Sequence, residues 1–387
     1  MKQTRKGLGN GCPLYKKCGG CQLQNMTYQQ QLSFKQAKVI KLLGKYSHVD
    51  EIIGMENPYH YRNKVQAAFG KTHAGKVVCG VYQSSSHRIV DVKNCMLEDK
   101  KADAIIQTIK SLIIKFNISP YNEDLHKGFL RHVLVKRGFA TNEIMVVLVA
   151  ASPVFKGKNE FVKALLNLHP EITTVILNVN DKNTSLVLGD RESVLYGNGY
   201  IKDILCGFTF RISSKSFYQI NPVQTQKLYS LAIKYAALTG RETVLDAYCG
   251  IGTIGITASE NAKNVIGVEL NSDAVHDAVI NAKINNVNNI FFYNRDAGEF
   301  MLDMARSNNK VDVVFMDPPR AGSDRKFLSS VITLQPKKIV YISCNPETLA
   351  RDLSTLVHGG YKVKKISPVD MFPHTNHVET VVLMTRK

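Results

Sequence analysis

The sequence predicts an α/β protein that ends in a doubly wound, mostly parallel sheet, preceded by a β-rich central domain and an N-terminal arm. Three observations support this fold class. From residue 243 onward, strand-like segments alternate with helical segments. A glycine-rich loop follows the first of these strands. From residue 60 to residue 205, short runs of β-branched and aromatic residues are separated by turn residues, as is typical of a β-rich domain.

Composition and charge narrow the function classes. The 387 residues are enough for two or three domains, and 44% of them are hydrophobic, which excludes a disordered or fibrous chain. No apolar run approaches the roughly 20 residues that span a bilayer, and the N-terminus lacks the apolar segment of a signal peptide. We therefore expect a cytoplasmic protein without membrane contact. The net charge of +18 favours a polyanionic partner, although a solvated basic face would explain it equally well.

Residues 1–50 form the predicted arm. The cysteine run from Cys12 to Cys21 is too rich in glycine to form a helix, whereas apolar residues at three-to-four spacing predict a helix over residues 26–43. The central domain, residues 51–205, is expected to contain helices near residues 99–116 and 157–168. Its predicted strands are residues 64–69, 77–82, 132–136, 143–150, 174–178 and 185–188.

The C-terminal domain, residues 206–387, begins with a predicted helix over residues 222–238. Its predicted strands are residues 243–246, 264–269, 290–293, 311–316 and 338–343, with a closing pair at 362–369 and 379–385. Helical segments between the strands make this a Rossmann-like arrangement, in which ligands bind at the carboxyl ends of the strands. The residues that follow each strand are therefore the candidates for a functional site.

Three successive strand ends carry the features of a nucleoside-binding site. The first strand ends in Asp246, and the next loop has glycines at positions 250, 252 and 255, which let the backbone approach a ligand closely. A carboxylate beside the loop repels a pyrophosphate but suits a cationic ammonium group. Glu269 can accept hydrogen bonds from both ribose hydroxyls, and Asp296 from an adenine amino group. Together these residues indicate S-adenosylmethionine, although each carboxylate alone could be a helix cap.

The fifth strand stops at Cys344, and the last strand begins at Glu379. Carbon 5 of a pyrimidine is too weak a nucleophile to take a methyl group directly, so an enzyme first adds a thiolate at carbon 6. A base must then remove the proton on carbon 5 before the thiolate can leave. We expect Cys344 to be this nucleophile and Glu379 this base. A strand-end cysteine alone is more often a buried structural residue.

A resemblance to a known family rests on five motifs that occur in the family's order. They are Phe217-Tyr-Gln219-Ile-Asn-Pro, Asp246-Ala-Tyr-Cys-Gly-Ile-Gly, Asp317-Pro-Pro-Arg, Ser343-Cys344-Asn345-Pro346 and His377-Val-Glu379. Over nearly its whole length the chain resembles the RNA 5-methyluridine (uracil-C5) methyltransferases, most of all the bacterial 23S ribosomal RNA enzymes with an N-terminal iron–sulfur motif. The resemblance implies an S-adenosylmethionine-dependent methyltransferase domain, with Cys344 as nucleophile and Glu379 as base. It also implies a cofactor pocket that contains Gln219, Tyr248, Glu269, Asp296 and Asp317.

The N-terminal cysteines form a candidate metal site. Cys12, Cys18 and Cys21 share one short loop, and Cys95 is the candidate fourth ligand, with Cys79 as its competitor. In a chain without a secretion signal, clustered thiolates suit zinc or an iron–sulfur cluster better than disulfides. Three clustered cysteines with a distant fourth are more typical of a [4Fe–4S] cluster, but the spacing alone does not choose. The resemblance implies the [4Fe–4S] cluster, which we expect to be structural.

The expected partner is RNA. Cations and aromatic rings are interleaved at residues 15–17, 59–64 and 129–132, a pattern that suits phosphates and stacked bases. A flipped-out uridine is expected to enter between Gln219, Asp317 and Cys344. Many relatives begin with a small RNA-binding β-barrel; we expect none here, so that the central domain holds the RNA. The expected substrate is 23S ribosomal RNA, and the alternatives are transfer RNA and a catalytically inactive RNA-binding protein. No obligatory protein partner is expected.

Overall fold

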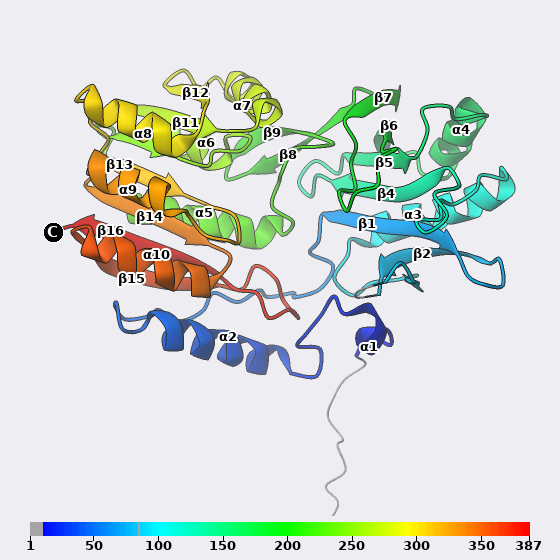
Figure 1. Ribbon diagram of the computed structural model, residues 1–387, viewed down its shortest axis with the longest axis horizontal. Coiled ribbons are helices and arrows are strands. Elements are labelled where there is room, and N and C mark those ends of the chain that lie inside the picture. The colour runs from blue at the N-terminus through cyan, green and yellow to red at the C-terminus, as the bar shows by residue number, and fades with distance from the viewer. Residues whose placement is uncertain (1–10, 84–85) are drawn as a thin grey trace, which may run out of the picture. The chain divides into compact units, whose positions relative to one another are not determined.

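The computed structural model describes residues 11–83 and 86–387. These residues form two compact units (Figure 1). The first unit contains the chain up to Asn25, together with Pro58–Ile204 and Arg211–Lys215. The second unit contains Met26–Asn57, Leu205–Phe210 and Ser216–Lys387. An N-terminal segment of about thirty residues therefore folds with the C-terminal part of the chain.

The first unit is a β-sheet with the strand order β3-β2-β1-β4-β5-β6-β7, antiparallel except for the pair β5 and β6. Helices α3 (Lys100–Lys115) and α4 (Lys158–Leu168) pack into one buried cluster with the central strands. Every residue of β5 is buried, which accounts for its continuous apolar sequence. The strands are β1 (Lys64–Lys71), β2 (Val77–Tyr82), β3 (Ile89–Asp91), β4 (Leu130–Arg137), β5 (Ile144–Ala150), β6 (Ile172–Val179) and β7 (Arg191–Tyr196).

The second unit contains the predicted doubly wound sheet, in the order β12-β11-β10-β13-β14-β16-β15. The first five strands in this order are parallel, and β16 runs antiparallel between β14 and β15. This arrangement confirms the predicted fold class. The strands are β10 (Thr243–Asp246), β11 (Asn264–Glu269), β12 (Ile290–Asn294), β13 (Val313–Met316), β14 (Lys338–Ser343), β15 (Tyr361–Val369) and β16 (Glu379–Arg386).

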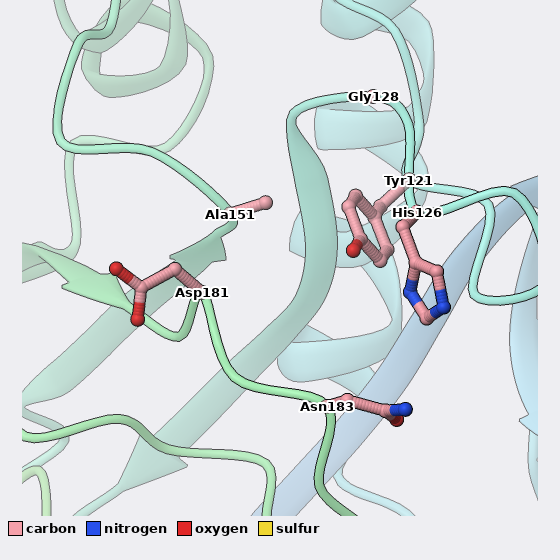
Figure 2. Close-up of a pocket in the computed structure, with 6 residues that line it drawn as sticks. All are labelled: Tyr121, His126, Gly128, Ala151, Asp181 and Asn183. Atoms are coloured by element: carbon pink, nitrogen blue, oxygen red, sulfur yellow. The ribbon is translucent and has the colours of Figure 1, made fainter.

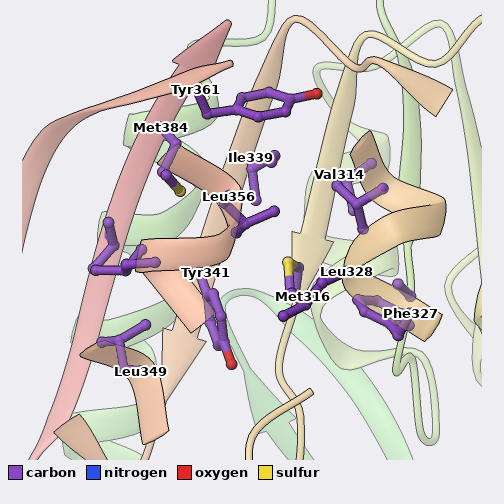
Figure 3. Packing of buried hydrophobic residues seen from close by; sticks show 14 of the residues in the cluster. Val314, Met316, Phe327, Leu328, Ile339, Tyr341, Leu349, Leu356, Tyr361 and Met384 are labelled. Atoms are coloured by element: carbon purple, nitrogen blue, oxygen red, sulfur yellow. The ribbon is translucent and has the colours of Figure 1, made fainter. Parts of the chain in front are cut away.

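Helices cover both faces of this second sheet. On one face, α2 (Tyr28–Leu43), α8 (Ala297–Arg306), α9 (Arg325–Leu334) and α10 (Pro346–His358) share one buried apolar cluster with the strands. Figure 3 shows Leu328 and Leu356 of these helices beside Val314 and Ile339 of the sheet. On the other face lie α5 (Pro222–Ala236), α6 (Thr253–Ser259) and α7 (Ser272–Ile284), which pack against strands from outside that cluster.

Several short elements differ from the sequence expectation. The strands β3, β7, β8 (Tyr200–Leu205) and β9 (Phe208–Ser213) were not expected; β7 is an exposed edge strand and lacks a buried apolar face. The predicted strand at 185–188 is wrong, because the carbonyls of Leu186 and Val187 accept hydrogen bonds from the Asn180 side chain in a loop. The cysteine run, expected to be free of helix, contains the single turn α1 (Tyr15–Cys18), which Gly19 ends at a φ of 70°.

The helices formed by residues 11–83 and 86–387 include none that is both long enough and apolar enough to cross a bilayer.

Candidate active site

The candidate site lies at the carboxyl ends of the parallel strands β10 to β14. Because these strands run in the same direction, the residues that follow them meet at one edge of the sheet. β10 pairs with β11 on one side and with β13 on the other, so the strand order reverses beside β10. Asp246, Glu269, Asp317 and Cys344, all predicted from the sequence, end these strands or directly follow them.

A buried carboxylate closes the loop between β10 and α6. Asp246 is fully buried, and its Oδ2 accepts a hydrogen bond from the N–H of Gly255 at 2.8 Å. Its Oδ1 is buried without a hydrogen-bond partner. Burial raises the pKa of Asp246 to about 7, against the opposing effect of the Gly255 hydrogen bond. A buried acceptor that lacks a donor fits a ligand with an ammonium group, as S-adenosylmethionine has.

Glu269 at the end of β11 braces the same loop. Its Oε2 accepts a hydrogen bond from the N–H of Gly250 at 3.1 Å, and its Oε1 accepts one from the N–H of Asn271 at 2.8 Å. Each carboxylate oxygen can accept a second hydrogen bond, so both remain available to ribose hydroxyls. Gly252 has a φ of 86°, and a Cβ there would lie 3.0 Å from the ring of Phe292, which explains the need for glycine.

Two other predicted cofactor residues have structural contacts. Asp296 is exposed and caps α8, where its Oδ1 accepts a hydrogen bond from the N–H of Glu299 at 2.9 Å. The ring of Tyr248 lies 4.9 Å from that of Phe327, and its hydroxyl donates to Ser323 Oγ at 3.4 Å. Both residues lie at the expected edge of the sheet, and their contact with a cofactor stays a prediction.

Tyr229 of α5 is a site residue that sequence reasoning missed. It is buried, and its hydroxyl accepts a hydrogen bond from Thr253 Oγ1 at 3.5 Å. The same hydroxyl hydrogen-bonds the side chain of Gln219 and lies near Asp317, and burial raises its pKa above the usual value. Tyr229 thus connects the glycine loop to the predicted Gln219. The only signal in the sequence was its place on the buried face of a helix, which core packing explains as well.

Strand register brings the predicted nucleophile and base together. In the antiparallel pair β14 and β16, Ser343 lies opposite Thr380. The next opposed positions are Cys344 and Glu379, so the two side chains leave the sheet at the same end. Cys344 is partly exposed, whereas Glu379 is buried.

Neighbouring carboxyl groups make the charged forms of Cys344 and Glu379 less favourable. Burial, followed by the nearby Glu379 and Asp317, raises the pKa of the Cys344 thiol to about 11, and Arg320 opposes the shift. Burial, followed by Asp317, raises the pKa of Glu379 well above its usual value, again against Arg320. The pKa of Asp317 is raised to about 7 by burial. A thiol, two carboxyl groups and a guanidinium therefore act on one another at one end of the sheet.

The loop after β13 holds Arg320 in place. Two prolines follow Asp317, and the carbonyl of Arg320 accepts hydrogen bonds from Asn345 Nδ2 at 3.3 Å and from Thr348 Oγ1 at 3.2 Å. Asn345 also caps α10, because its Oδ1 accepts a hydrogen bond from the N–H of Glu347 at 3.0 Å. Asn345, the residue after the predicted nucleophile, thus fixes the loop that carries Arg320.

The N-terminal cysteines lie in the first unit. Burial raises the pKa of the Cys21 thiol, and the neighbouring Cys18 and Cys12 raise it further, so these three lie close together. The pKa of Cys95 is raised to about 12, first by burial and then by Glu98. Within residues 11–83 and 86–387, no three Cys, His, Asp or Glu side chains are arranged to hold a metal ion. As they lie here, the four predicted thiols do not together form such a site, and Cys79, the competing fourth ligand, is buried in the apolar core.

The predicted RNA-binding segments are partly buried. In residues 129–132, Arg131 is buried, pairs with Glu123 at 2.7 Å and stacks on Tyr121 with its guanidinium 4.9 Å from the ring centre. His132 is buried as well, so this segment does not offer the surface that we expected. In residues 59–64, Tyr59 is exposed whereas residues 61 and 63 are buried.

Two neighbouring cavities in the first unit share Tyr121. The one shown in Figure 2 has a volume of about 460 Å³, with Tyr121 and His126 from one connection and Asp181 and Asn183 from another. Asp181 is already paired with Arg191 at 2.5 Å. The second cavity has a volume of about 770 Å³. Its lining includes the cationic side chains Lys71 and Arg88, the histidines His73 and His87, and the carboxylates of Asp91, Glu123 and Asp124.

The comparisons with known proteins relate this chain to RNA methyltransferases. A sequence profile of the tRNA (uracil-5-)-methyltransferase family matches residues 27–387. An uncharacterized RNA methyltransferase of Clostridium tetani is 46% identical over 97% of this chain and 82% of its own length. One from Staphylococcus aureus is 43% identical over 97% and 84%. The crystal structure of Pyrococcus abyssi tRNA (uracil-54, C5)-methyltransferase with S-adenosyl-L-homocysteine is 30% identical, with a TM-score of 0.80 over 95% of this chain and 86% of that one.

Proposed function

The chain belongs to the tRNA (uracil-5-)-methyltransferase family, an S-adenosylmethionine-dependent family of RNA uracil-C5 methyltransferases, and from this premise we propose that it methylates a uridine of 23S ribosomal RNA through Cys344 and Glu379. The observation that carries the proposed mechanism is the β14–β16 register, which sets Cys344 opposite Glu379 beside Asp317 and Arg320. This arrangement supplies a nucleophile and a base on the same side of one sheet edge.

The proposed reaction uses the thiol first and the carboxylate second. The Cys344 thiolate adds to carbon 6 of the uracil ring, and the ring electrons make carbon 5 nucleophilic. Bound S-adenosylmethionine supplies an electrophilic methyl group to carbon 5. Glu379 then takes the proton from the methylated carbon 5, the carbon 5–carbon 6 double bond forms again, and the carbon–sulfur bond breaks. A carboxyl group with a raised pKa is a stronger base once it has ionised, which suits Glu379 to this step.

The proposed cofactor residues surround the loop after β10. Asp246 would receive the ammonium group through its unpartnered Oδ1, and Glu269 would receive the ribose hydroxyls. Tyr248 and Asp296 would contact the adenine side, and Gln219 and Asp317 would lie next to the reacting atoms. What supports this assignment is the position of these residues at the ends of neighbouring strands and, for Gln219, its hydrogen bond to Tyr229.

The uridine must leave its base stack to reach Cys344, because stacked neighbours cover carbon 5 in a paired region. We propose that the first unit holds the flanking RNA through the cations around its larger cavity, of which Lys71 and Arg88 are examples. This assignment replaces residues 129–132, whose side chains are engaged within the unit.

For Cys12, Cys18, Cys21 and Cys95 we propose a structural [4Fe–4S] cluster. The closeness of the first three and the presence of Cys95 in the same unit support it, but Cys95 would have to approach the other three thiols. Protein purified without oxygen should contain iron and inorganic sulfide and be brown. A colourless, zinc-loaded protein would contradict the proposal, and neither catalytic step depends on it.

The substrate test is methylation of purified RNA with a labelled methyl donor. We expect label in a single class of RNA, 23S ribosomal RNA, because the four cysteines resemble those of the ribosomal RNA enzymes. Transfer RNA is the second candidate, which the similarity to the Pyrococcus abyssi enzyme favours. Label in transfer RNA alone would contradict the ribosomal assignment, and no label in either would contradict the proposed reaction.

A further inference from the structure

A buried polar network connects helix α2 to the segment that leads into Glu379. Lys35 of α2 and Asp370 after β15 are both fully buried, and Lys35 Nζ lies 2.5 Å from Asp370 Oδ1. Lys35 Nζ also donates a hydrogen bond to the carbonyl of Phe372 at 3.0 Å. The hydroxyl of Tyr28, one of the first residues of α2, donates to Asp370 Oδ2 at 2.9 Å. Both oxygens of the Asp370 carboxylate are therefore held by α2.

Gln31, one helical turn before Lys35, fixes the middle of the same segment. This side chain is fully buried, and its Oε1 accepts a hydrogen bond from the N–H of His374 at 2.8 Å. Its Nε2 lies 3.2 Å from His374 Nδ1, and because an amide nitrogen can only donate, the ring nitrogen accepts. His374 has a φ of 68°, a left-handed conformation that is costly for a residue with a side chain. Gln31 thus stabilises a strained turn five residues before Glu379.

Helix α5 holds the same segment from a second side. Asn221 Nδ2, at the start of α5, donates to the carbonyl of Met371 at 2.9 Å, and Gln224 Nε2 donates to the carbonyl of Asp370 at 3.0 Å. The backbone between β15 and Glu379 is therefore bound by side chains at several successive residues.

The energetics of the buried Lys35–Asp370 pair also favour a role in positioning the backbone over a role in stability. A buried ion pair loses much of its attraction to the desolvation of both charges, and replacing such a pair with apolar residues is often neutral or stabilising. The Lys35–Asp370 pair is therefore weak evidence for a contribution to folding. What it does provide is directional hydrogen bonding that an apolar contact lacks. This segment leads directly into Glu379, which lies opposite Cys344.

We propose that Gln31 and Lys35 are positioning residues for Glu379: by fixing residues 370–374 from α2, they set the course of the segment that leads to Glu379 and so hold the carboxylate where it can take the proton from carbon 5. This inference rests on the proposed function. Both side chains are fully buried, and their hydrogen bonds link α2 to residues 370–374. The consequence is specific to one step, because Glu379 acts after the methyl group has been transferred.

The test measures methyl transfer and product release separately within one turnover. Gln31→Leu should slow release of methylated RNA from the enzyme by about tenfold to a hundredfold, since a displacement of ~1 Å in a catalytic group costs up to about 10²-fold. Methyl transfer and cofactor affinity should stay within about twofold of the wild type. A denaturing gel separates methylated RNA still bonded to protein from free product. Gln29→Leu, on the exposed side of α2, is the matched control and should behave as the wild type.

A second variant distinguishes a loss of positioning from a loss of folding. Lys35→Met combined with Asp370→Leu replaces the pair by apolar residues of similar size, with Lys41→Met as the exposed control. We expect the double variant to melt close to the wild type and still accumulate the bonded, methylated RNA. Unchanged release in both variants, or equal slowing of transfer and release, would overturn the inference. If the wild type itself methylates no uridine, the proposed function fails instead, and this inference with it.

Discussion

Glu379 and Asp317 make the thiolate form of Cys344 less favourable, Asp317 does the same to the Glu379 carboxylate, and Arg320 offsets both effects. The arrangement therefore suits a site in which only one of the two groups is charged at a time. In the proposed order, sulfur is bonded to the uracil ring and carries no charge when Glu379 must be an anion. Strand register brings the two residues together, and their closeness suits a reaction in which they are charged at different steps.

Replacing Glu379 by glutamine should separate the two steps. The amide keeps the size of the side chain but cannot accept the proton, so methylated RNA should accumulate while still bonded to Cys344. Release of free product should fall by about 10²- to 10⁴-fold, the usual contribution of a general base. The measurement is the fraction of labelled RNA that migrates with protein on a denaturing gel.

Glu347 of α10 provides the matched control, because it is an exposed carboxyl three residues after Cys344. Glu347→Gln should release product as the wild type does. Free product at the normal rate from Glu379→Gln would show that another group removes the proton.

At the scale of elements, the loop between β10 and α6 links cofactor binding to pH. The pKa of Asp246 is raised to about 7, so the carboxyl is neutral below that pH and anionic above it. Only the anion attracts an ammonium group. Affinity for S-adenosyl-L-homocysteine, measured by calorimetry, should therefore weaken as the pH falls from about 8 to about 6.

Asp246→Asn should remove most of this dependence. The amide oxygen can still accept the hydrogen bond from Gly255, so the loop keeps its shape, but the side chain no longer titrates. We expect weak affinity that changes little with pH, apart from the contribution of Asp317, whose pKa is also raised to about 7. Parallel pH profiles for the variant and the wild type would contradict a contact between Asp246 and the ammonium group.

The sequence was most informative where an element is buried on both faces. The apolar runs of β5 and β14 predict strands because unpaired polar side chains are costly at positions buried on both faces. The edge strand β7 is mostly exposed and carries no such pattern, so it was missed. The apolar run at 185–188 does not form the predicted strand. Its carbonyls accept hydrogen bonds from the Asn180 side chain, and the spacing of apolar residues in the sequence does not reveal such a contact.

In the candidate site, too, some residues could be predicted from the sequence and others could be found only from the structure. Strand ends can be read from the sequence, which is why Asp246, Glu269 and Cys344 were predicted at one edge of the sheet. Contacts made across the fold cannot be read in this way. Gln31 and Lys35 look like ordinary polar positions of an amphipathic helix, and only the structure shows that they are fully buried against residues 370–374.

At the scale of the whole molecule, the net charge of +18 and the family membership together imply binding to a polyanion. RNA affinity should fall steeply with salt, because each phosphate contact releases condensed counterions. If Arg88 beside the larger cavity contacts a phosphate, Arg88→Gln should reduce the slope of log affinity against log salt by about 1.

Arg241 is the matched control for this slope. It is exposed just before β10, at the amino-terminal edge of the sheet and away from the strand ends that carry Cys344. Arg241→Gln should leave the slope unchanged. Equal slopes for Arg88→Gln and the wild type would show that Arg88 makes no phosphate contact.

The central claim is that the Cys344 sulfur bonds to the uracil ring, and trapping with RNA that contains 5-fluorouridine tests it most directly. Fluorine on carbon 5 cannot be removed as a proton, so the bonded intermediate persists and its peptide can be identified by mass spectrometry. The account predicts one RNA-bearing peptide, which contains Cys344, and no adduct in Cys344→Ala, whereas Cys206→Ala should still form it. An RNA-bearing peptide from any other part of the chain, or an adduct that persists in Cys344→Ala, would contradict the account.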